Sequence, residues 1–486
     1  MDEDVQKLKE QAELEKEREL LQLNESQFTE YLARRDTFVP SLRDIDEMLD
    51  SRIVGERYNR LSVFTVFILS QICVYVSGDS GAGKTQLMDA VTSTLMPGAA
   101  CVVSQGSGKL IFTNKKARDM NKAKYIVMPE LNKVHNNLDL VEVLKTWGEG
   151  KDASYERSEF GKSVNKVPLD CKPFIFSRAT ESAKIAPVPG ELMTRVAEFM
   201  VDSSKEQTSD VMDSIAESAE NPFNIVERDV VTEALIRYYV TNLNHKNIFM
   251  NPMAKVLTNY VPKVFAASRR DFKRYLRNIN GICNFHHPDR MFITRGEGEH
   301  AQRVYLVTPQ DVFYNHIIFG QTLIRSAMRC NQIEKKIIKI CSLTKSGFTK
   351  GQIQSALRTD SINTTLNNVE NHLNELVNIG YLLAEKTGRE YYYTVSDTYR
   401  EFEAKPDMRE LVEYTVQSIK HNPHLTASEK SEYINRYCTG AGLNVVHPFT
   451  GETVNILDYE FEDINNERTT FAGVSGRKVQ VTIGDV

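Results

Sequence analysis

Short apolar runs alternate with longer stretches of helical spacing from residue 53 to about residue 224, which predicts a parallel sheet with crossover helices. The runs Val74–Ser77, Tyr125–Met128 and Phe174–Ser177 are apolar and end at polar residues, as buried strands do. Residues 226–330 have mainly helical spacing, with one β-ribbon predicted over Met291–Val307. The pattern therefore indicates an α/β core followed by a helical lid.

The hydrophobic pattern divides the chain into five segments, since 486 residues are too many for one core. They are an N-terminal helical arm (1–50), the α/β core (51–225), the helical lid (226–330), a separate C-terminal module (331–400) and an extension to which we assign no role (401–486). The arm is rich in Glu, Lys, Leu and Gln and is predicted to be a loosely amphipathic helix, either solvated or bound to a partner.

The C-terminal module has the pattern of a winged helix-turn-helix. Helices are predicted over Ile333–Leu343, Lys350–Leu357 and Asn363–Ile379, and a two-stranded ribbon follows. The third helix would enter the major groove of duplex DNA, whereas the ribbon would touch phosphates. The residues that we predict to contact DNA there are Thr364, Asn367, Lys386 and Arg389.

A complete phosphate-binding loop follows the first predicted strand. Its residues are Gly78, Asp79, Ser80, Gly81, Ala82, Gly83, Lys84 and Thr85, which fit G-x-x-x-x-G-K-[ST], and Gln86 continues into a predicted helix. Glycines allow backbone N–H groups to turn towards the β-phosphate of ATP, and the helix N-terminus adds a positive dipole. Lys84 would reach the β- and γ-phosphates, and the Thr85 hydroxyl would bind Mg²⁺.

Two further strands supply candidate polar groups. Glu130 follows the strand Tyr125–Met128, where a carboxylate can polarise the attacking water or hold the metal through a water. Many P-loop motors have an Asp-Glu pair here, but this chain has Pro129 before Glu130. A third strand ends at Ser177-Arg178-Ala179-Thr180, where AAA+ proteins, which this pattern resembles, have a polar sensor of the γ-phosphate, so that either Ser177 or Thr180 could have this role.

The segment Glu191–Asp202 resembles a stretch of the minichromosome maintenance (MCM) helicases of the AAA+ class, which reads roughly L-S-R-F-D, apolar run, acidic residue. The resemblance implies that Arg195 is an arginine finger that reaches the nucleotide of a neighbouring subunit. Val196-Ala197 stands where the family has Phe-Asp. The order of elements agrees over roughly residues 50–290, and Ser204–Thr208 also resembles the ATPase domains of phage and plasmid primase-associated helicases, relatives of the superfamily-three helicases.

The same resemblance implies two more sets of functional residues. Ser268–Phe272 opens a helix where MCM-like lids have a second sensor arginine, so Arg269 or Arg270 would contact the γ-phosphate. Alternation on both sides of Phe160–Ser163 predicts a β-hairpin. In MCM and superfamily-three helicases such a hairpin enters the ring channel and grips DNA, which would make Lys162 the tip residue, with Lys151 and Lys166 behind it.

The composition excludes only a few classes of protein and of binding site. A net charge of −5 does not indicate nucleic-acid binding, although a ring can concentrate basic residues in its pore. The seven cysteines form no C-x-x-C pair, and no metal-binding cluster stands out. The apolar run Val63–Val76 is shorter than the roughly 20 residues that a bilayer needs, so we predict a buried helix leading into a strand. We expect no membrane association and a cytoplasmic location.

We therefore predict an AAA+ P-loop core with a parallel sheet, a helical lid and a C-terminal winged helix-turn-helix. The predicted function is an ATP- and Mg²⁺-dependent DNA helicase or translocase that assembles as a homo-oligomeric ring, a hexamer by its MCM resemblance, with single-stranded DNA in the channel. Two alternatives stay open. One is an origin or transposition regulator that switches on ATP without unwinding DNA, and the other is a defence ATPase with a protein partner. Replication or mobile-element proteins are further possible partners.

Overall fold

The computed structural model describes most of the chain, in two compact units. The described residues are 2–103, 114–131, 138–159, 162–179, 188, 190–221, 228–261, 263, 268–296, 298, 301–320, 330, 332–359, 362, 364–400 and 405–461. The first unit comprises Met1–Ala327 with Pro406–Leu457, and the second comprises Met328–Lys405 with Asp458–Val486.

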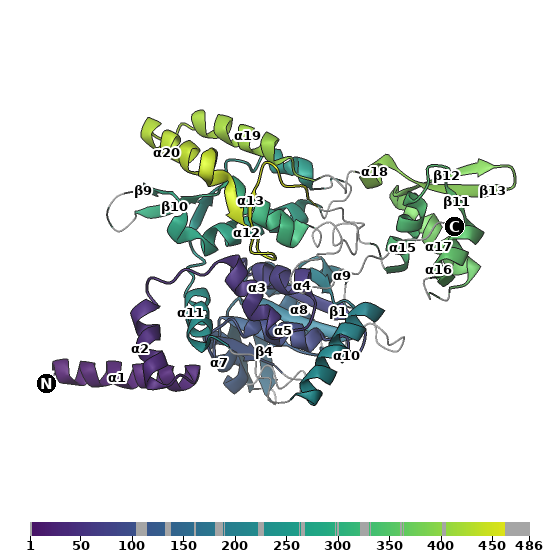
Figure 1. Ribbon diagram of the computed structural model, residues 1–486. Helices are drawn as coiled ribbons and strands as arrows, with labels where there is room; N and C mark the ends of the chain where they lie inside the picture. Colours follow the sequence, from purple (N-terminus) through teal and green to yellow (C-terminus); the bar gives the residue numbers. More distant parts are fainter. Residues whose placement is uncertain are drawn as a thin grey trace. The chain divides into compact units, whose positions relative to one another are not determined.

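A five-stranded, all-parallel sheet forms the centre of the first unit (Figure 1). Its order is β2-β3-β6-β1-β7, with bounds β1 (Val74–Gly78), β2 (Ala100–Val102), β3 (Tyr125–Met128), β6 (Phe174–Ala179) and β7 (Ala197–Met200). Every residue of β1 and β3 is buried, as expected of parallel strands covered on both faces. The predicted α/β core with a parallel sheet is confirmed.

Helices cover the sheet and bury its aromatic side chains. The covering helices are α5 (Lys84–Thr92), α7 (Asn114–Lys122), α8 (Leu138–Gly148) and α9 (Gly190–Met193). Trp147 on α8 packs beside Phe174, and Tyr75 stacks on Phe176 with ring centroids 4.8 Å apart. These contacts explain why the three core strands are read as apolar runs in the sequence.

The apolar run before β1 forms a helix with a π-helical end. α4 (Arg57–Val63) continues as η1 (Phe64–Leu69), in which all six side chains are buried. The long helix α12 (Ser268–Phe285) packs against η1, and the Ser70 hydroxyl lies 2.7 Å from Asn278 Oδ1. The predicted buried helix that leads into a strand is confirmed.

The N-terminal segment packs on the first unit through its second helix. It contains α1 (Asp2–Leu21), α2 (Glu25–Arg34) and α3 (Leu42–Asp50), and capping boxes at Asn24 and Ser41 begin the second and third of these helices. Phe28 and Tyr31 of α2 are buried against α11 (Val230–Thr241). The burial of α2 gives this segment a structural role in the core.

The lid contains a small sheet and joins residues from the far end of the sequence. Its elements include β8 (Ile248–Met250), η3 (Val256–Tyr260), η4 (His287–Asp289), β9 (Phe292–Arg295), β10 (Gln302–Leu306), α13 (Pro309–Asn315) and η6 (His316–Gly320), whereas α10 (Lys205–Glu220) belongs to the core segment that precedes the lid. The β-ribbon predicted over Met291–Val307 is present as β9 and β10. Buried Asp311 binds Arg290 through three contacts of 2.6–3.2 Å.

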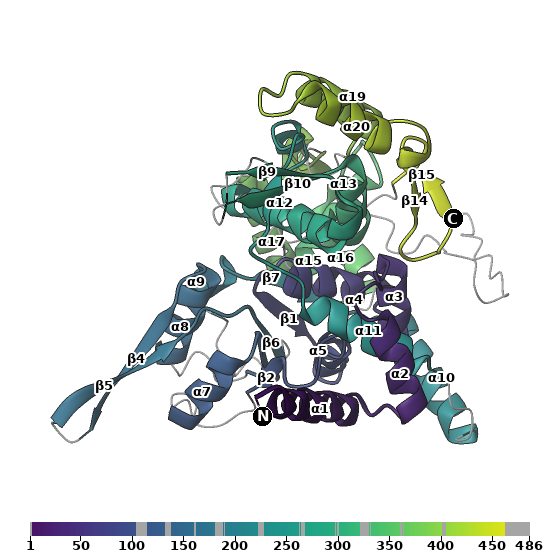
Figure 2. The same cartoon turned by 90° about the vertical axis from the view of Figure 1, so that its left-hand side faces the viewer.

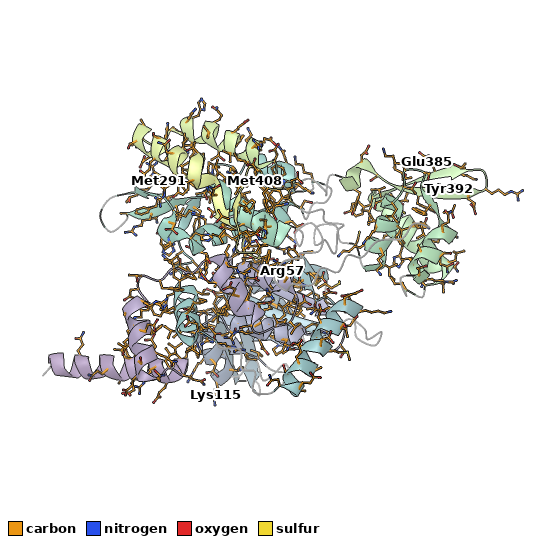
Figure 3. The ribbon with its side chains drawn as sticks, in the orientation of Figure 1. Arg57, Lys115, Met291, Glu385, Tyr392 and Met408 are labelled. Atoms are coloured by element: carbon orange, nitrogen blue, oxygen red, sulfur yellow. The ribbon has the colours of Figure 1, made fainter. Side chains whose placement is uncertain are left out.

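Pro406–Leu457 packs on this lid. Its elements are α19 (Met408–Lys420), α20 (Ala427–Tyr437), η8 (Gly440–Leu443), β14 (Asn444–Val446) and β15 (Thr453–Asn455). The Tyr437 hydroxyl accepts a hydrogen bond from the Met291 backbone N–H at 2.8 Å, and Met291 and Met408 are labelled in Figure 3. Part of the unassigned 401–486 extension is therefore integral to the first unit.

A long antiparallel hairpin extends from the first unit (Figure 2). It consists of β4 (Ala153–Glu159) and β5 (Lys162–Leu169), with a register shift at Ser158/Glu159. The hairpin predicted between Glu130 and the third core strand is confirmed, and its tip residues 160 and 161 lie outside the described residues.

The second unit contains three principal helices and a three-stranded sheet. Its elements are α15 (Gln332–Ser342), β11 (Phe348–Thr349), α16 (Lys350–Thr359), α17 (Leu366–Ile379), β12 (Leu382–Thr387), β13 (Glu390–Val395) and α18 (Asp397–Arg400). The sheet order is β11-β13-β12, and Glu385 pairs with Tyr392 across the hairpin (Figure 3). Gly380, at φ 88°, ends α17 in the left-handed conformation that favours glycine.

Within the described part of the chain, every helix is too short or too polar to span a bilayer.

Candidate nucleotide-binding site

The phosphate-binding loop connects β1 to α5 at the carboxyl edge of the sheet. Gly81 and Gly83 have φ values of 83° and 87°, which residues with a Cβ rarely adopt. A Cβ on Gly81 would meet nothing within 4 Å, so the conformation of the backbone and not crowding requires glycine there. The loop is thus shaped so that backbone N–H groups and the start of α5 can face an anion.

Lys84 is the buried cation of this loop. Its Nζ donates hydrogen bonds to the carbonyl oxygens of Gly78, at 3.0 Å, and Asp79, and the side chain is 7% exposed. An ammonium group held over backbone carbonyls can transfer its hydrogen bonds to phosphate oxygens, which bind a cation more strongly. The geometry therefore holds Lys84 close to the position of a bound phosphate.

The neighbouring loop residues are accessible. Ser80, Thr85 and Gln86 are exposed, whereas Asp79 and Ala82 are half-buried. The hydroxyl of Thr85 and the carboxylate of exposed Glu130 are hard oxygen donors, the type that Mg²⁺ prefers. Their chemistry fits the metal that the sequence predicts, with water and phosphate oxygens supplying the other ligands.

Glu130 adopts a strained backbone conformation at the end of β3. Its φ is 55°, in the left-handed region that costs a residue with a Cβ about 1–3 kcal/mol. The Glu130 N–H donates to the Ser177 hydroxyl at 3.1 Å, and the Leu131 N–H donates to the Ser177 carbonyl at 2.8 Å. Ser177 thus accepts two hydrogen bonds that hold the strained turn, and this turn carries the Glu130 carboxylate.

Ser177 lies between the loop and Glu130 because β6 is inserted between β1 and β3. Its Cα is the register partner of Val76, two residues before Gly78, and its side chain is fully buried. This is the place, between the phosphate loop and the strand before Glu130, at which the sequence expects a sensor. Thr180, the other sensor candidate, lies outside the described residues.

Arg195 lies at the opposite, amino edge of the sheet. It lies two residues before β7, and its guanidinium contacts the Glu149 carboxylate at 2.7 and 3.1 Å and donates to the Glu191 carbonyl at 2.6 Å. The hydrogen bonds from Arg195 and Lys151 lower the pKa of Glu149 to about 2. The five residues of β1 rise about 16 Å, so Arg195 lies far from the phosphate loop of its own chain.

The candidate second-sensor arginines also lie towards the amino edge. Arg269 and Arg270 are exposed in the first turn of α12. One turn later, Arg274 donates to the Thr194 carbonyl at 2.7 Å, and Arg277 donates to the Gln71 carbonyl at 3.2 Å. Both acceptors precede strands of the sheet, so the start of α12 is directed away from the loop of the same chain.

The structure describes the side chain of one of the three candidate hairpin lysines and the backbone of all three. Lys151, before β4, is exposed and pairs with Glu149 at 3.0 Å. Lys162 is the first residue of β5, beside the tip, and Lys166 is paired in register with Glu156. The side chains of Lys162 and Lys166 lie outside the described residues, so only their backbone places are fixed.

In the second unit, one predicted DNA contact needs correction. Thr364 is buried, at 8% exposure, and precedes the N-cap Thr365, so its side chain is not presented on the surface of α17. Asn367 is exposed in the first turn of that helix. Lys386 and Arg389 are exposed on the hairpin, and Lys386 Nζ lies 5.9 Å from the ring centroid of Tyr391.

Sequence analysis missed a segment that closes the carboxyl edge beside the loop. Buried Glu56, at φ 50°, accepts a hydrogen bond from the Asp202 N–H at 2.6 Å. Gln207 Nε2 donates to the Val54 carbonyl at 2.8 Å. Burial raises the pKa of Glu56. No local pattern indicates this pairing, because its two halves are separated by the whole core.

No model of a protein family matches the sequence, and no curated protein matches it. Among solved structures, the chain is similar to a protein from Cytophaga hutchinsonii described as a "putative ATPase". The identity is 13% over 60% of this chain and 86% of the other, with a TM-score of 0.34. A score this low does not establish a common function.

Proposed function

We propose that the protein is an ATPase whose active site is completed by a neighbouring copy of the chain. The observation that carries this proposal is the separation of two half-sites on one sheet. Lys84, Glu130 and Ser177 lie at the carboxyl edge, whereas Arg195 lies at the amino edge. An arginine that serves hydrolysis from the amino edge can act only on the nucleotide of another subunit.

The proposed chemistry follows from the side chains at each edge. Lys84 and the loop N–H groups would bind the β- and γ-phosphates, and Thr85 with Glu130 would hold Mg²⁺, which would neutralise phosphate charge. Glu130 orients and activates the attacking water, and Ser177 fixes the turn that positions it. Arg195 of the neighbour leaves Glu149 and stabilises the charge that develops on the γ-phosphate. Hydrolysis would then depend on assembly.

The finer proposal is an MCM-like DNA helicase or translocase that assembles as a ring. Its support is the sequence resemblance, together with the β4–β5 hairpin that extends from the amino edge, where Arg195 also lies. A positive tip at Lys162 would follow the DNA backbone without reading sequence. In such a ring the hairpins of all subunits would line the channel.

We also propose that the second unit is a winged helix-turn-helix that binds duplex DNA. Its three helices and the β12–β13 hairpin have the order and lengths that this module requires. Exposed Asn367 would face base edges, whereas Lys386 and Arg389 would contact phosphates. Buried Thr364 is no longer among the proposed contacts.

The test is ATP hydrolysis with and without single-stranded DNA, in wild type and in three variants. Lys84→Ala should abolish turnover, and Lys162→Ala should lose only the stimulation by DNA. Lys115→Ala is the matched control, because this exposed lysine lies in the first turn of α7, a helix that carries none of the proposed site residues (Figure 3). Turnover that ignores DNA, or a silent Lys162→Ala variant, would exclude the motor and favour the regulator or the protein-partnered ATPase.

A further inference from the structure

Three metal-ligating side chains converge in the second unit. Glu334 lies on α15, whereas His372 and Glu375 lie on α17. One potential ligand atom from each of the three residues lies within 4.8 Å of the other two. The set joins the first and third helices of the unit and contains a nitrogen donor besides two carboxylates.

The spacing of the donor atoms suits one shared ion. His372 Nδ1 lies 2.9 Å from Glu334 Oε1. Two ligand atoms that are each about 2.1 Å from one metal ion have a separation of this order when they occupy adjacent coordination positions. His372 and Glu375 are three residues apart, so they lie on the same side of α17.

A simple His–Glu ion pair explains this geometry less well. It accounts for His372 beside Glu334, but it does not account for the second carboxylate. Glu334 is buried, at 4% exposure, and ionised carboxylates this close repel one another unless a cation lies between them. A divalent ion would offset both negative charges and accept the imidazole nitrogen.

We propose that Glu334, His372 and Glu375 bind a divalent transition-metal cation of the zinc class. Imidazole with carboxylate oxygens suits Zn²⁺ better than Mg²⁺, which favours oxygen ligands alone. Three protein ligands leave a coordination position open to water or to a nearby side chain. The metal would fix α17 against α15. This proposal is independent of the proposed ATPase activity.

The test is titration of the full-length, chelator-treated protein with Zn²⁺, without nucleotide. Wild type should bind one ion that Glu375→Gln weakens by at least about tenfold, and His372→Ala by more. Glu370→Gln is the matched control, because this exposed residue lies on α17 and pairs with Lys350 at 2.8 Å. Glu375 is exposed, so its variant should fold even if the His372 variant does not.

A second readout is the thermal unfolding of the same proteins with and without Zn²⁺. Bound metal should raise the unfolding midpoint in wild type and in Glu370→Gln but not in Glu375→Gln. Zinc binding of equal strength in Glu375→Gln and wild type would assign the ion to other ligands and overturn the proposal. Wild-type protein that binds no Zn²⁺ would overturn it as well.

Discussion

The two edges of the central sheet carry different chemistry. At the carboxyl edge, Lys84 donates to the Gly78 carbonyl at the end of β1, and Ser177 on the neighbouring strand β6 accepts a hydrogen bond from the Glu130 N–H. At the amino edge, Arg195 and Arg274 are held by Glu149 and by the Thr194 carbonyl. Every strand is parallel, so the two edges are separated by the full length of the strands and cannot serve one nucleotide in one chain.

This difference indicates how hydrolysis would be controlled. The phosphate loop is formed by consecutive residues and exists in an isolated chain. Arg195 is instead paired within its own chain at 18% side-chain exposure, and it would have to exchange Glu149 for a phosphate of a neighbour. The Glu149 carboxylate is 39% exposed, and an ion pair that water reaches costs little to exchange for a stronger anion. Assembly would then be the switch.

The largest expected effect comes from removing Arg195, which tests directly whether the two edges of the sheet act together. Arg195→Ala should lower ATP turnover by about 10³-fold or more, because the transition-state charge loses its cation. Mixing Arg195→Ala with Lys84→Ala subunits should restore part of the activity, since about a quarter of randomly formed interfaces combine both intact halves. Steady-state ATPase assays on equimolar mixtures measure this. No recovery despite subunit exchange would place Arg195 outside the active site.

Glu130→Gln should have the next largest effect, and it tests the chemistry of the carboxyl edge alone. Removal of the general base should reduce hydrolysis by about 10²-fold or more while ATP binding persists. Nucleotide binding by fluorescence titration, beside single-turnover hydrolysis, separates the two steps. Equal loss of binding and turnover would indicate that the role of Glu130 in holding the metal outweighs its role as the base.

Ser177→Ala should have a smaller effect, because it acts through Glu130. The backbone N–H of Glu130 would lose its acceptor at 3.1 Å, and the strained turn would relax. A lost hydrogen bond of about 1–1.5 kcal/mol corresponds to roughly a tenfold fall in kcat. Ser177→Thr keeps the hydroxyl and should retain more activity. If the two variants were equally impaired, packing and not the hydrogen bond would be the cause.

The smallest expected effect is on the free energy of unfolding in acid, through a histidine near the amino edge. Burial, together with the positive charges of Lys124 and Arg277, lowers the pKa of His245 to about 4. The unfolded state therefore binds the extra proton between about pH 6.5 and pH 4, and the free energy of unfolding falls as the pH drops through that window. We expect a loss of about 1–2 kcal/mol at pH 5.

Thermal unfolding at pH 7 and pH 5 measures this loss. His245→Asn keeps a polar group beside Tyr125, whose hydroxyl lies 3.3 Å from the imidazole Nε2, but it does not titrate. The variant should therefore show a weaker dependence on pH. An unchanged pH dependence in His245→Asn would assign the acid sensitivity to other buried histidines.

The sequence predicts best those elements that depend only on residues close together in the chain. The strands before Gly78 and Glu130, the hairpin and α17 are all visible as periodic patterns, because side chains alternate or repeat within each element. The position of Arg269 and Arg270 is not visible in this way. Contacts of Arg274 and Arg277 with residues about 80 and 206 positions away place the start of α12 at the amino edge.

The same limit explains the burial of Thr364 and the role of the C-terminal extension. Thr364 lies in a polar run that predicts exposure, but its carbonyl accepts a hydrogen bond from Gln354 and its side chain faces the core. Residues 406–457 have helical spacing without a visible partner, and the partner is the lid. Neither contact can be recognised from a short stretch of the sequence alone.

The sequence by itself determined the phosphate loop, the strand that precedes it and the alternation that builds a parallel sheet, because glycine placement and side-chain periodicity act over a few residues. Only the tertiary structure decided that Ser177 holds Glu130 in a left-handed turn, that Arg195 lies at the far edge beside Glu149, and that Glu334 meets His372 and Glu375. These three arrangements depend on strand order and helix packing, which residues distant in the sequence fix together.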